Sequence, residues 1–441
     1  MKTIVLGPPG TGKTTTLLNK VEEHLKETDP NKIGYFSFTQ KAAYEARDRA
    51  MKKFNYTEDD LPYFRTLHSL AFRRLGIKKE NVMQKRHYED LGKKINIFID
   101  YMEYDDEEGG TFTTKSDYLR IIQLAKLRNI TISQQYNLKE HTQDVEFSKL
   151  KIIANELESY KKQYGLVDFN DMILDFIKSD SSPKFDVVFI DEAQDLSLMQ
   201  WDMARSIWNK TDDSYIAGDD DQAIFKWAGA DVDSFIAQDG KFIRLVQSHR
   251  VPKKVHDIAM RIVNRISKRL PKNWQPRTVE GFLTRHSKFE NVNMSEGEWL
   301  ILARTRYMLN ELEEVLYRKG LYYKNKFKKS YEQNLYDAIM NWEQWKKGSV
   351  MNPDQIKQIY GYMSPQHADK NQLLIMNKDA HYSLNDCKDK FGLRTDSVWY
   401  ESLDDAPWRK VEYIRKMRSN GEQLNKAPRI LLSTIHGVKG G

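Results

Sequence analysis

The sequence has one cysteine, Cys387, among its 441 residues. A single cysteine excludes an intrachain disulfide, a four-cysteine zinc site and an iron–sulfur cluster held by this chain alone. Long apolar runs are also missing, because the runs VVFI and LLIM at residues 187–190 and 373–376 are far shorter than the roughly 20 residues that cross a bilayer. The apolar stretch before Gly7 is also shorter than a signal-peptide core, which spans about 7 to 15 residues. These absences predict a cytoplasmic protein without a membrane partner, for example of a bacterium or of a phage-infected cell.

Internal repeats and low-complexity stretches are absent as well, so the chain is expected to be ordered nearly throughout. Its length predicts about two to four domains at the usual domain size. Lysine and arginine outnumber the acidic residues by 70 to 63, which gives a formal net charge of +7. This balance tolerates a polyanionic partner without requiring one.

Short apolar runs that end in glycine, threonine or acidic residues alternate with helix-like segments such as residues 14–26. Runs of this kind occupy residues 3–6, 33–38, 187–190 and 214–217. The alternation predicts an α/β fold with a parallel sheet. A second set at residues 242–246, 299–303 and 430–433 predicts a second α/β unit.

The strongest motif is GPPGTGKT at residues 7–14, which fits the phosphate-binding pattern GxxxxGK[ST] between a strand and a helix. Glycines let backbone N–H groups converge on phosphate oxygens, and the helix N-terminus adds the positive end of its dipole. Lys13 is expected to bridge the β- and γ-phosphates and Thr14 to bind Mg²⁺. The predicted nucleotide contacts are Gly7, Pro8, Pro9, Gly10, Thr11, Gly12, Lys13, Thr14 and Thr15. Alone, this motif indicates only a nucleoside triphosphate.

An acidic pair, Asp191 and Glu192, follows the apolar run at 187–190. Asp191 is expected to hold Mg²⁺, and Glu192 to orient or deprotonate the attacking water. A strand followed by a helix N-cap would also explain an acidic pair at this position. Two complementary motifs in one chain favour hydrolysis over binding alone.

The segment DEAQDLS at residues 191–197 resembles the second motif of UvrD/Rep-like superfamily 1 helicases. Further stretches resemble other motifs of that family in order along the chain. They are FSFTQKAA (36–43), TLHSLA (66–71), DFNDM (168–172), GDDDQAIFKWAGA (218–230), LVQSHR (245–250), ILART (301–305) and TIHGVKG (434–440).

The resemblance implies roles for individual residues. Gln222 would sense the γ-phosphate, and Arg250 would reach the phosphates as an arginine finger from the second α/β domain. Trp227 and Phe38 would stack on unpaired bases, although burial in a core is the commoner fate of an aromatic side chain. Contacts to phosphates or sugars are expected from Thr39, Thr66, His68, Arg304, Thr434 and His436. Neither histidine has partners at metal-ligand spacing.

The resemblance also implies an architecture of two RecA-like parallel-sheet P-loop domains with helical or mixed insertions. The first domain would comprise residues 1–76 and 148–240, with an inserted helical subdomain at 77–147. The second would comprise residues 241–327 and 427–441 and be incomplete at its C-terminus, with a short accessory subdomain at 328–426.

Three departures from the family pattern bear on these expectations. The phosphate loop begins at Gly7, so the upstream glutamine segment that recognises adenine in these helicases is not seen. Ala228 stands where the family commonly has arginine, which predicts altered coupling between the nucleotide and DNA sites. The chain ends at Gly441, inside the motif that Thr434 begins. We therefore expect a chain truncated before the last family motif, with weak ATP hydrolysis.

These patterns predict an ATP- and Mg²⁺-dependent DNA helicase or single-strand translocase of DNA repair or replication. The resemblance implies 3′ to 5′ movement on single-stranded DNA or at a junction with duplex, with accessory replication or repair proteins as further partners. One alternative is an ATP-gated switch that binds single-stranded DNA with little unwinding. Another is a small-molecule kinase that uses the same phosphate loop, but it leaves Asp195, Gln222, Trp227 and Arg250 unexplained.

Overall fold

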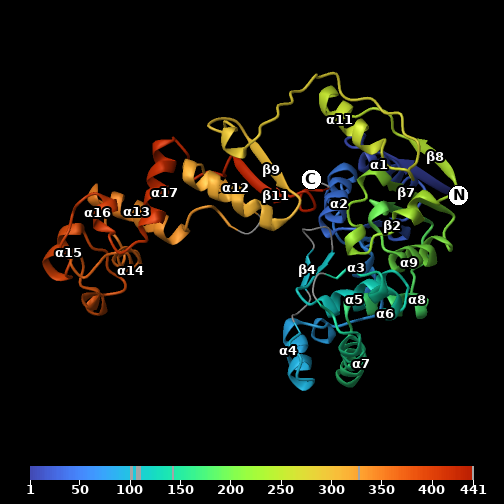
Figure 1. Cartoon of the computed structure of the whole chain (residues 1–441), viewed down its shortest axis with the longest axis horizontal. Coiled ribbons are helices and arrows are strands. Elements are labelled where there is room, and N and C mark those ends of the chain that lie inside the picture. Colours follow the sequence, from blue (N-terminus) through green and yellow to red (C-terminus); the bar gives the residue numbers. More distant parts are fainter. Residues whose placement is uncertain (100–102, 106–110, 142–143, 326–327, 440–441) are drawn as a thin grey trace. The chain divides into compact units, whose positions relative to one another are not determined.

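The computed structural model describes residues 1–99, 103–105, 111–141, 144–325 and 328–439. The chain divides into two compact units (Figure 1). Unit 1 comprises Met1–Thr284 and Lys439–Gly441, and unit 2 comprises Arg285–Val438. No helix among the described residues has the length and apolar character needed to cross a membrane.

Unit 1 is built on a six-stranded parallel sheet with the strand order β3-β2-β6-β7-β1-β8. Its strands are β1 (Lys2–Leu6), β2 (Ile33–Ser37), β3 (Phe64–Thr66), β6 (Val187–Asp191), β7 (Asp213–Gly218) and β8 (Lys241–Arg244). The central strands are apolar along almost their whole length and buried, as expected for a parallel sheet with both faces covered. The predicted α/β class with a parallel sheet is therefore confirmed.

Helices cover both faces of this sheet. On one face, α1 (Lys13–His24) and α2 (Gln40–Phe54) share a core with Val5 of β1. On the other face, α3 (Leu67–Arg74), α8 (Phe169–Lys178) and α9 (Leu198–Trp208) share a core with Ile4 and Leu6. Alternate residues of β1 thus enter opposite cores, because successive side chains of a strand point to opposite faces. The short helix α10 (Val232–Ile236) follows β7.

One predicted strand belongs to a different sheet from the one expected. The run at 242–246 was assigned to the second α/β unit, but β8 pairs in parallel with β1 of the first sheet, with Ile4 opposite Phe242. The assignment was wrong because an apolar run shows that a strand exists but not which strand it pairs with. Residues 245–284 also belong to unit 1, including α11 (Lys253–Val263), which buries none of its residues.

The insertion in unit 1 has a core of its own. It contains α4 (Lys85–Lys94), α5 (Asp117–Leu127), α6 (Ile132–Asn137), α7 (Phe147–Tyr164) and the hairpin β4 (Glu103–Asp105) and β5 (Thr111–Thr113). This core includes Leu150, Ile153 and Leu157 of α7, so it extends beyond the predicted end at residue 147. Buried ion pairs join the insertion to α8: Lys161 donates to Asp168 at 2.9 Å and to Asp171 at 2.6 Å.

Unit 2 contains a three-stranded parallel sheet with the order β10-β11-β9. Its strands are β9 (Trp299–Ala303), β10 (Tyr323–Lys324) and β11 (Ile430–Thr434), so the predicted strands at 299–303 and 430–433 are confirmed as neighbours. The helices are α12 (Arg306–Lys319), α13 (Gln333–Lys346), α14 (Pro353–Gly361), α15 (Leu384–Lys390), α16 (Trp399–Ser402) and α17 (Trp408–Ser419).

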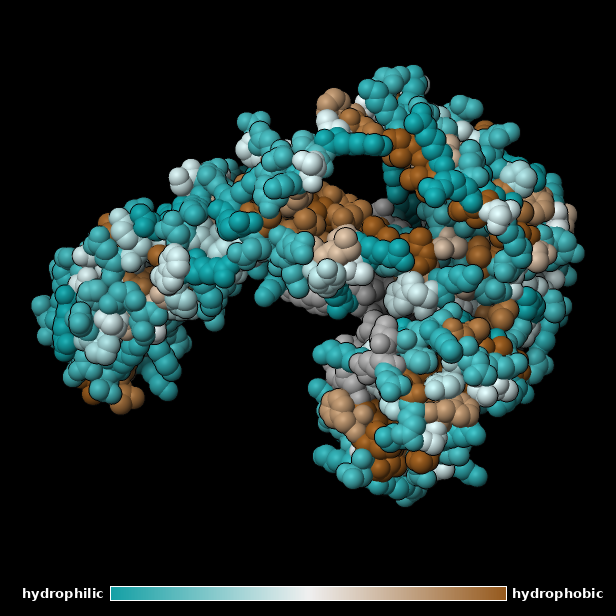
Figure 2. Space-filling model, viewed as in Figure 1, coloured by the Kyte–Doolittle hydropathy of each residue, from teal (hydrophilic) through white to brown (hydrophobic). Residues whose placement is uncertain are grey.

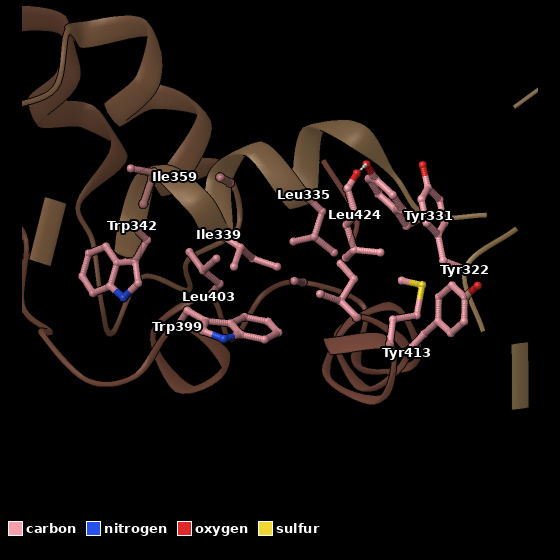
Figure 3. Packing of buried hydrophobic residues seen from close by; sticks show 14 of the residues in the cluster. Tyr322, Tyr331, Leu335, Ile339, Trp342, Ile359, Trp399, Leu403, Tyr413 and Leu424 are labelled. Carbon is pink, nitrogen blue, oxygen red and sulfur yellow. Dashed lines mark hydrogen bonds between the residues drawn. The ribbon is translucent and has the colours of Figure 1, made fainter. Parts of the chain in front are cut away.

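One continuous apolar core runs through unit 2. Figure 3 shows Trp342 of α13 near Trp399 and Leu403, and Tyr331 near Tyr322. The same core includes residues of β9 and β11, so segment 328–426 has no core separate from that sheet.

One face of the unit 2 sheet exposes apolar side chains. Leu300 and Leu302 of β9 and Leu431 of β11 alternate with buried residues and are exposed. Figure 2 shows apolar residues gathered on the surface of unit 2 where Figure 1 labels β9 and β11. Parallel sheets are usually covered on both faces, so this face is unusual.

Candidate nucleotide-binding site

The predicted nucleotide residues gather at the carboxyl edge of the unit 1 sheet. Leu6 lies opposite Gly218, and Ser37 lies opposite Asp191, so the loops after β1, β6 and β7 leave the sheet side by side. They surround a cleft of about 570 Å³. Its lining residues are Pro8, Pro9, Gly10, Thr11, Gly12, Lys13, Thr14, Thr15, Ala42, Glu45, Arg49, Asp191, Glu192, Gln222, His249, Arg250 and Arg277. Of the predicted nucleotide contacts, only Gly7 is not among these residues.

The loop between β1 and α1 has the backbone that a phosphate cradle needs. Gly10 and Gly12 have φ of +71° and +87°, which glycine adopts without the steric cost that other residues meet. Thr11 Oγ1 donates to the carbonyl of Pro8 at 2.8 Å and closes the turn. A Cβ on Gly7 would lie 2.2 Å from Cγ of Lys13, so glycine is needed there for the lysine to pass. The chain then enters the 12-residue helix α1, whose N-terminus favours an anion.

Lys13 supplies positive charge at this cradle. Its Nζ donates to the carbonyl of Gly7 at 3.2 Å and lies 3.5 Å from Oε1 of Glu192. Burial alone would lower the pKa of Lys13, but the charges of Glu192, Asp219 and Asp191 outweigh burial and raise it. The ammonium is therefore charged at neutral pH and suits a polyphosphate.

Thr14 and Asp191 meet directly, as the predicted magnesium site requires. Thr14 Oγ1 donates to Asp191 Oδ2 at 2.9 Å, and Tyr35 OH donates to the same oxygen at 2.9 Å. Burial, followed by the charge of Glu192, raises the pKa of Asp191. Among the described residues no three His, Cys, Asp or Glu side chains form a metal cage. Two protein oxygens fit Mg²⁺, which usually keeps several waters and binds substrate phosphates.

Glu192 lies at a strained backbone position beside the cleft. Its φ is +54°, which is uncommon for a residue other than glycine, and strain of this kind clusters at functional sites. Its Oε2 accepts a hydrogen bond from Nε2 of Gln194 at 2.6 Å. Burial alone would raise the pKa of Glu192, but Lys13 and Lys439 lower it overall. Glu192 is therefore an ionised carboxylate at neutral pH, as a base for water must be.

A hydrogen-bond path connects Glu192 with Gln222. Gln194, held by Glu192, accepts from the backbone N–H of Asp219 at 3.0 Å through Oε1. Asp219 Oδ2 in turn accepts from Nε2 of Gln222 at 2.6 Å. Lys439 donates to the carbonyl of Gln222 at 2.6 Å and to Asp195 Oδ1 at 2.6 Å. The predicted base and the predicted γ-phosphate sensor thus share one polar network.

Arg250 lines the cleft, but from a segment of unit 1 and not from the second α/β unit as expected. Ser248 Oγ donates to the carbonyl of Pro9 at 2.7 Å, and the N–H of His249 donates to the carbonyl of Gly10 at 2.9 Å. These bonds tie the segment to the phosphate loop. A Cβ on Gly10 would lie 2.4 Å from Cβ of Arg250, so the close approach requires glycine.

The predicted nucleic-acid residues of unit 1 differ in their exposure. Trp227, next to the loop after β7, is 44% exposed. Phe38 is only 7% exposed and packs against Phe225 with ring centroids 5.6 Å apart, so its position does not support stacking on a base. Thr39 and Thr66 use their hydroxyl groups to cap α2 and α3. His68, in α3, is buried.

The other three residues lie at the carboxyl edge of the unit 2 sheet. Thr434 ends β11 opposite Ala303 of β9, and Arg304 follows directly. Arg304 is exposed, His436 is half-buried and Thr434 is buried. Thr434 Oγ1 accepts a hydrogen bond from the N–H of Gly437 at 3.1 Å. The sheet therefore brings Arg304 close to the loop that Thr434 begins. Gly440, at the end of the motif TIHGVKG, lies outside the described residues.

Several residues of the site were not predicted from the sequence. Tyr35, Gln194 and Asp219 contact the predicted residues by hydrogen bonds, and Arg49 and Arg277 line the cleft. Gln194 and Asp219 lie inside recognised motifs, so the sequence indicated that they could belong to the site. No sequence pattern indicated Tyr35 or Arg277. Strand pairing brings Tyr35 to Asp191, and a long loop brings Arg277 to the cleft.

Comparisons with known proteins show the family of the chain. Residues 1–243, more than half of the chain, match the family model described as the UvrD/REP helicase N-terminal domain. The chain is 24% identical over 366 residues to the ATP-dependent DNA helicase PcrA of Bacillus subtilis (strain 168), which covers 73% of this chain and 48% of that protein. It is 22% identical over 375 residues to the ATP-dependent DNA helicase Rep of Buchnera aphidicola subsp. Acyrthosiphon pisum (strain APS), covering 74% and 56%. The chain spans about half the length of these curated relatives.

Proposed function

The chain belongs to the UvrD/REP helicase family, and from that premise we propose that it is an ATP-dependent DNA helicase that moves along single-stranded DNA. The observation that carries this proposal is the meeting of Thr14 and Asp191 at 2.9 Å, beside Lys13 and the ionised Glu192. A site that only binds a nucleotide does not need a base beside the magnesium ligands. The names of the relatives support ATP as the nucleotide and DNA as the substrate.

In this proposal each residue of the cleft has a role with ATP. The loop of residues 7–12 and Lys13 would hold the phosphates, and Thr14 with Asp191 would hold Mg²⁺. When bound, Mg²⁺ would neutralise developing charge on the phosphates. Glu192 would orient and deprotonate the attacking water, and Gln222 would contact the γ-phosphate. Arg250 would stabilise transition-state charge, an effect of about 10³ to 10⁵ in rate for arginine fingers.

We also propose two RecA-like domains, the first of them built on the six-stranded sheet of unit 1, which includes β8. The second would be built around β9, β10 and β11, with residues 328–426 as its accessory insertion. The parallel ladders of these strands and the exposed apolar face of their sheet support a larger domain.

For the DNA, we propose that Trp227 stacks on bases and that Thr39, Arg304 and His436 contact the backbone. The burial of Thr66 and Thr434 does not support such a contact. Stacking is independent of base sequence, as a motor requires. Movement from 3′ to 5′, action at single/double-strand junctions and accessory replication or repair proteins stay predictions from the family resemblance. The location in the cytoplasm likewise stays a prediction.

An ATP-gated switch that binds single-stranded DNA is the second candidate. Ala228, in the turn that carries Trp227, packs its apolar side chain against the unit 1 core, where the family commonly has arginine. An alanine at this position has no charge that could couple the nucleotide site to the DNA site, which favours a switch over a motor.

The direct test is ATP turnover by the 441-residue chain with and without single-stranded DNA. We expect DNA to stimulate turnover and Glu192→Gln to abolish it while ATP still binds. Nucleotide-dependent DNA affinity without stimulated turnover would favour the switch. Phosphorylation of a small acceptor, with no response to DNA, would favour the kinase.

A further inference from the structure

Three consecutive aspartates after β7 converge on one buried lysine. Lys272 is 6% exposed, and its Nζ lies 2.7 Å from Asp219, 2.5 Å from Asp220 and 2.9 Å from Asp221. Asp219 and Asp220 are themselves buried. Burial alone would lower the pKa of Lys272, but Asp219 and the hydrogen bonds to all three carboxylates raise it. The ammonium is therefore the counter-charge that allows these carboxylates to lie together in the interior.

The segment that carries Lys272 makes further contacts with the same run. Arg269 binds Asp221 through two nitrogens, with Nε donating to Oδ1 at 2.8 Å and Nη2 to Oδ2 at 2.6 Å. The backbone N–H of Leu270 donates to Asp220 Oδ2 at 2.8 Å. Each carboxylate thus has a donor from residues 269–272, and the three acidic and two basic side chains leave a net charge of −1.

Asp219 extends these contacts to the nucleotide cleft. Its Oδ1 accepts from Lys272 at 2.7 Å, while its Oδ2 accepts from Nε2 of Gln222 at 2.6 Å. The carboxylate therefore joins the buried lysine to the side chain that lines the cleft. Without the ammonium, Asp219 would lose this hydrogen bond while the two neighbouring carboxylates remain, and its side chain would have to move.

We propose that Lys272 is a positioning residue of the nucleotide site: by holding Asp219 it fixes the side chain of Gln222 toward the terminal phosphate of a nucleoside triphosphate. This proposal rests on the proposed function, because it presumes that Gln222 distinguishes a triphosphate from a diphosphate. Lys272 is not among the residues that line the cleft, and it acts through Asp219. Residues 269–272 thereby determine how much more tightly the cleft binds a nucleoside triphosphate than a diphosphate.

The test is the ratio of affinities for a non-hydrolysable ATP analogue and for ADP, both with Mg²⁺, measured by calorimetry on the 441-residue chain. Gln222→Ala sets the ratio that remains without the sensor. A lost hydrogen bond to a charged group corresponds to a decrease of about 10- to 100-fold. We expect Lys272→Met to lower the ratio to the same value and the double variant to lower it no further. Lys272→Arg, which keeps the charge, should restore most of the ratio.

Lys268→Met is the matched control, because Lys268 is exposed and pairs with Asp233 at 2.7 Å, outside the aspartate run. It should keep the wild-type ratio. If Lys272→Met does not fold, Asp219→Asn provides the same test, since Asp220 and Asp221 still hold the lysine. A wild-type ratio in folded Lys272→Met or Asp219→Asn, or additive losses in the double variant, would overturn the proposal. Both ligands bind without turnover or DNA, so a failed motor function would be seen separately in the turnover assay.

Discussion

His68 is expected to make the stability of unit 1 sensitive to acid. The side chain is 5% exposed in α3, and burial lowers its pKa to about 4, although the charge of Asp168 acts in the opposite direction. In the unfolded chain a histidine has a pKa of about 6.5. Between these two values the unfolded chain binds a proton that the folded chain does not. The free energy of unfolding therefore decreases as the pH falls from about 6.5 to about 4 and levels off below that range.

The size of this effect follows from the two pKa values. The loss in the free energy of unfolding caused by His68, relative to neutral pH, amounts to about 2 kcal/mol at pH 5 and approaches about 3 kcal/mol at pH 4. Urea unfolding at pH 7 and pH 5, followed by circular dichroism, measures it. His68→Gln cannot titrate, so its loss of stability between the two pH values should be about 2 kcal/mol smaller than that of the wild type.

The exposed His381 provides the control, because an exposed side chain meets water in the folded and in the unfolded chain. His381→Gln should keep the wild-type dependence on pH. If His68→Gln loses as much stability as the wild type between pH 7 and pH 5, the buried neutral state of His68 is refuted. A neutral His68 also brings no charge to a DNA phosphate, so His68→Gln should leave the salt dependence of DNA binding unchanged.

Three further predictions concern single residues of unit 1. Gly10→Ala should lower ATP affinity at least about tenfold in a fluorescent-nucleotide titration, because a Cβ at φ +71° costs about 1–2 kcal/mol and would clash with Arg250. Gly76→Ala is the control and should keep wild-type affinity, because Gly76 has φ +62° but no atom lies within 4 Å of its Cβ position. Equal losses of affinity in the two variants would contradict this prediction. Lys161→Met should lower the free energy of unfolding in urea by about 3–5 kcal/mol, since it leaves buried carboxylates unpaired. The exposed Lys149→Met should change it by less than about 0.5 kcal/mol, and similar values for the two would refute the role of the network. Trp227→Ala should weaken single-stranded DNA binding in an anisotropy assay by about 1–3 kcal/mol whatever the base sequence, and unchanged affinity would exclude stacking.

Local patterns predicted most of the residues that lie together in the candidate nucleotide site. The phosphate loop and the Asp191–Glu192 pair each follow an apolar strand, and parallel strands carry their carboxyl ends to one edge. This geometry brings Thr14 to Asp191 although 177 positions separate them. The motifs thus fixed which residues meet, because the sheet leaves little freedom in where its loops lie.

Long-range packing was not predictable in the same way. β8 pairs with β1 because β1 would otherwise be an edge strand of the sheet. An apolar run in the sequence does not indicate which strand it pairs with. Phe38 follows a strand as a base-stacking residue would, but only the structure shows that Phe225 covers it. Lys272 lies 53 positions after Asp219 in a loop without periodicity, so no spacing links the two.

Arrival times of the 441-residue chain at a dye on the end of single-stranded DNA would test the motor function most directly. Stopped-flow measurements would use strands of several lengths, with the dye at the 5′ or the 3′ end and ATP with Mg²⁺ added to the preformed complex. We expect the arrival time at the 5′ end to grow in proportion to strand length, and Glu192→Gln to give no arrival at all. Arrival times that do not depend on length, in a protein that still hydrolyses ATP, would contradict movement along DNA.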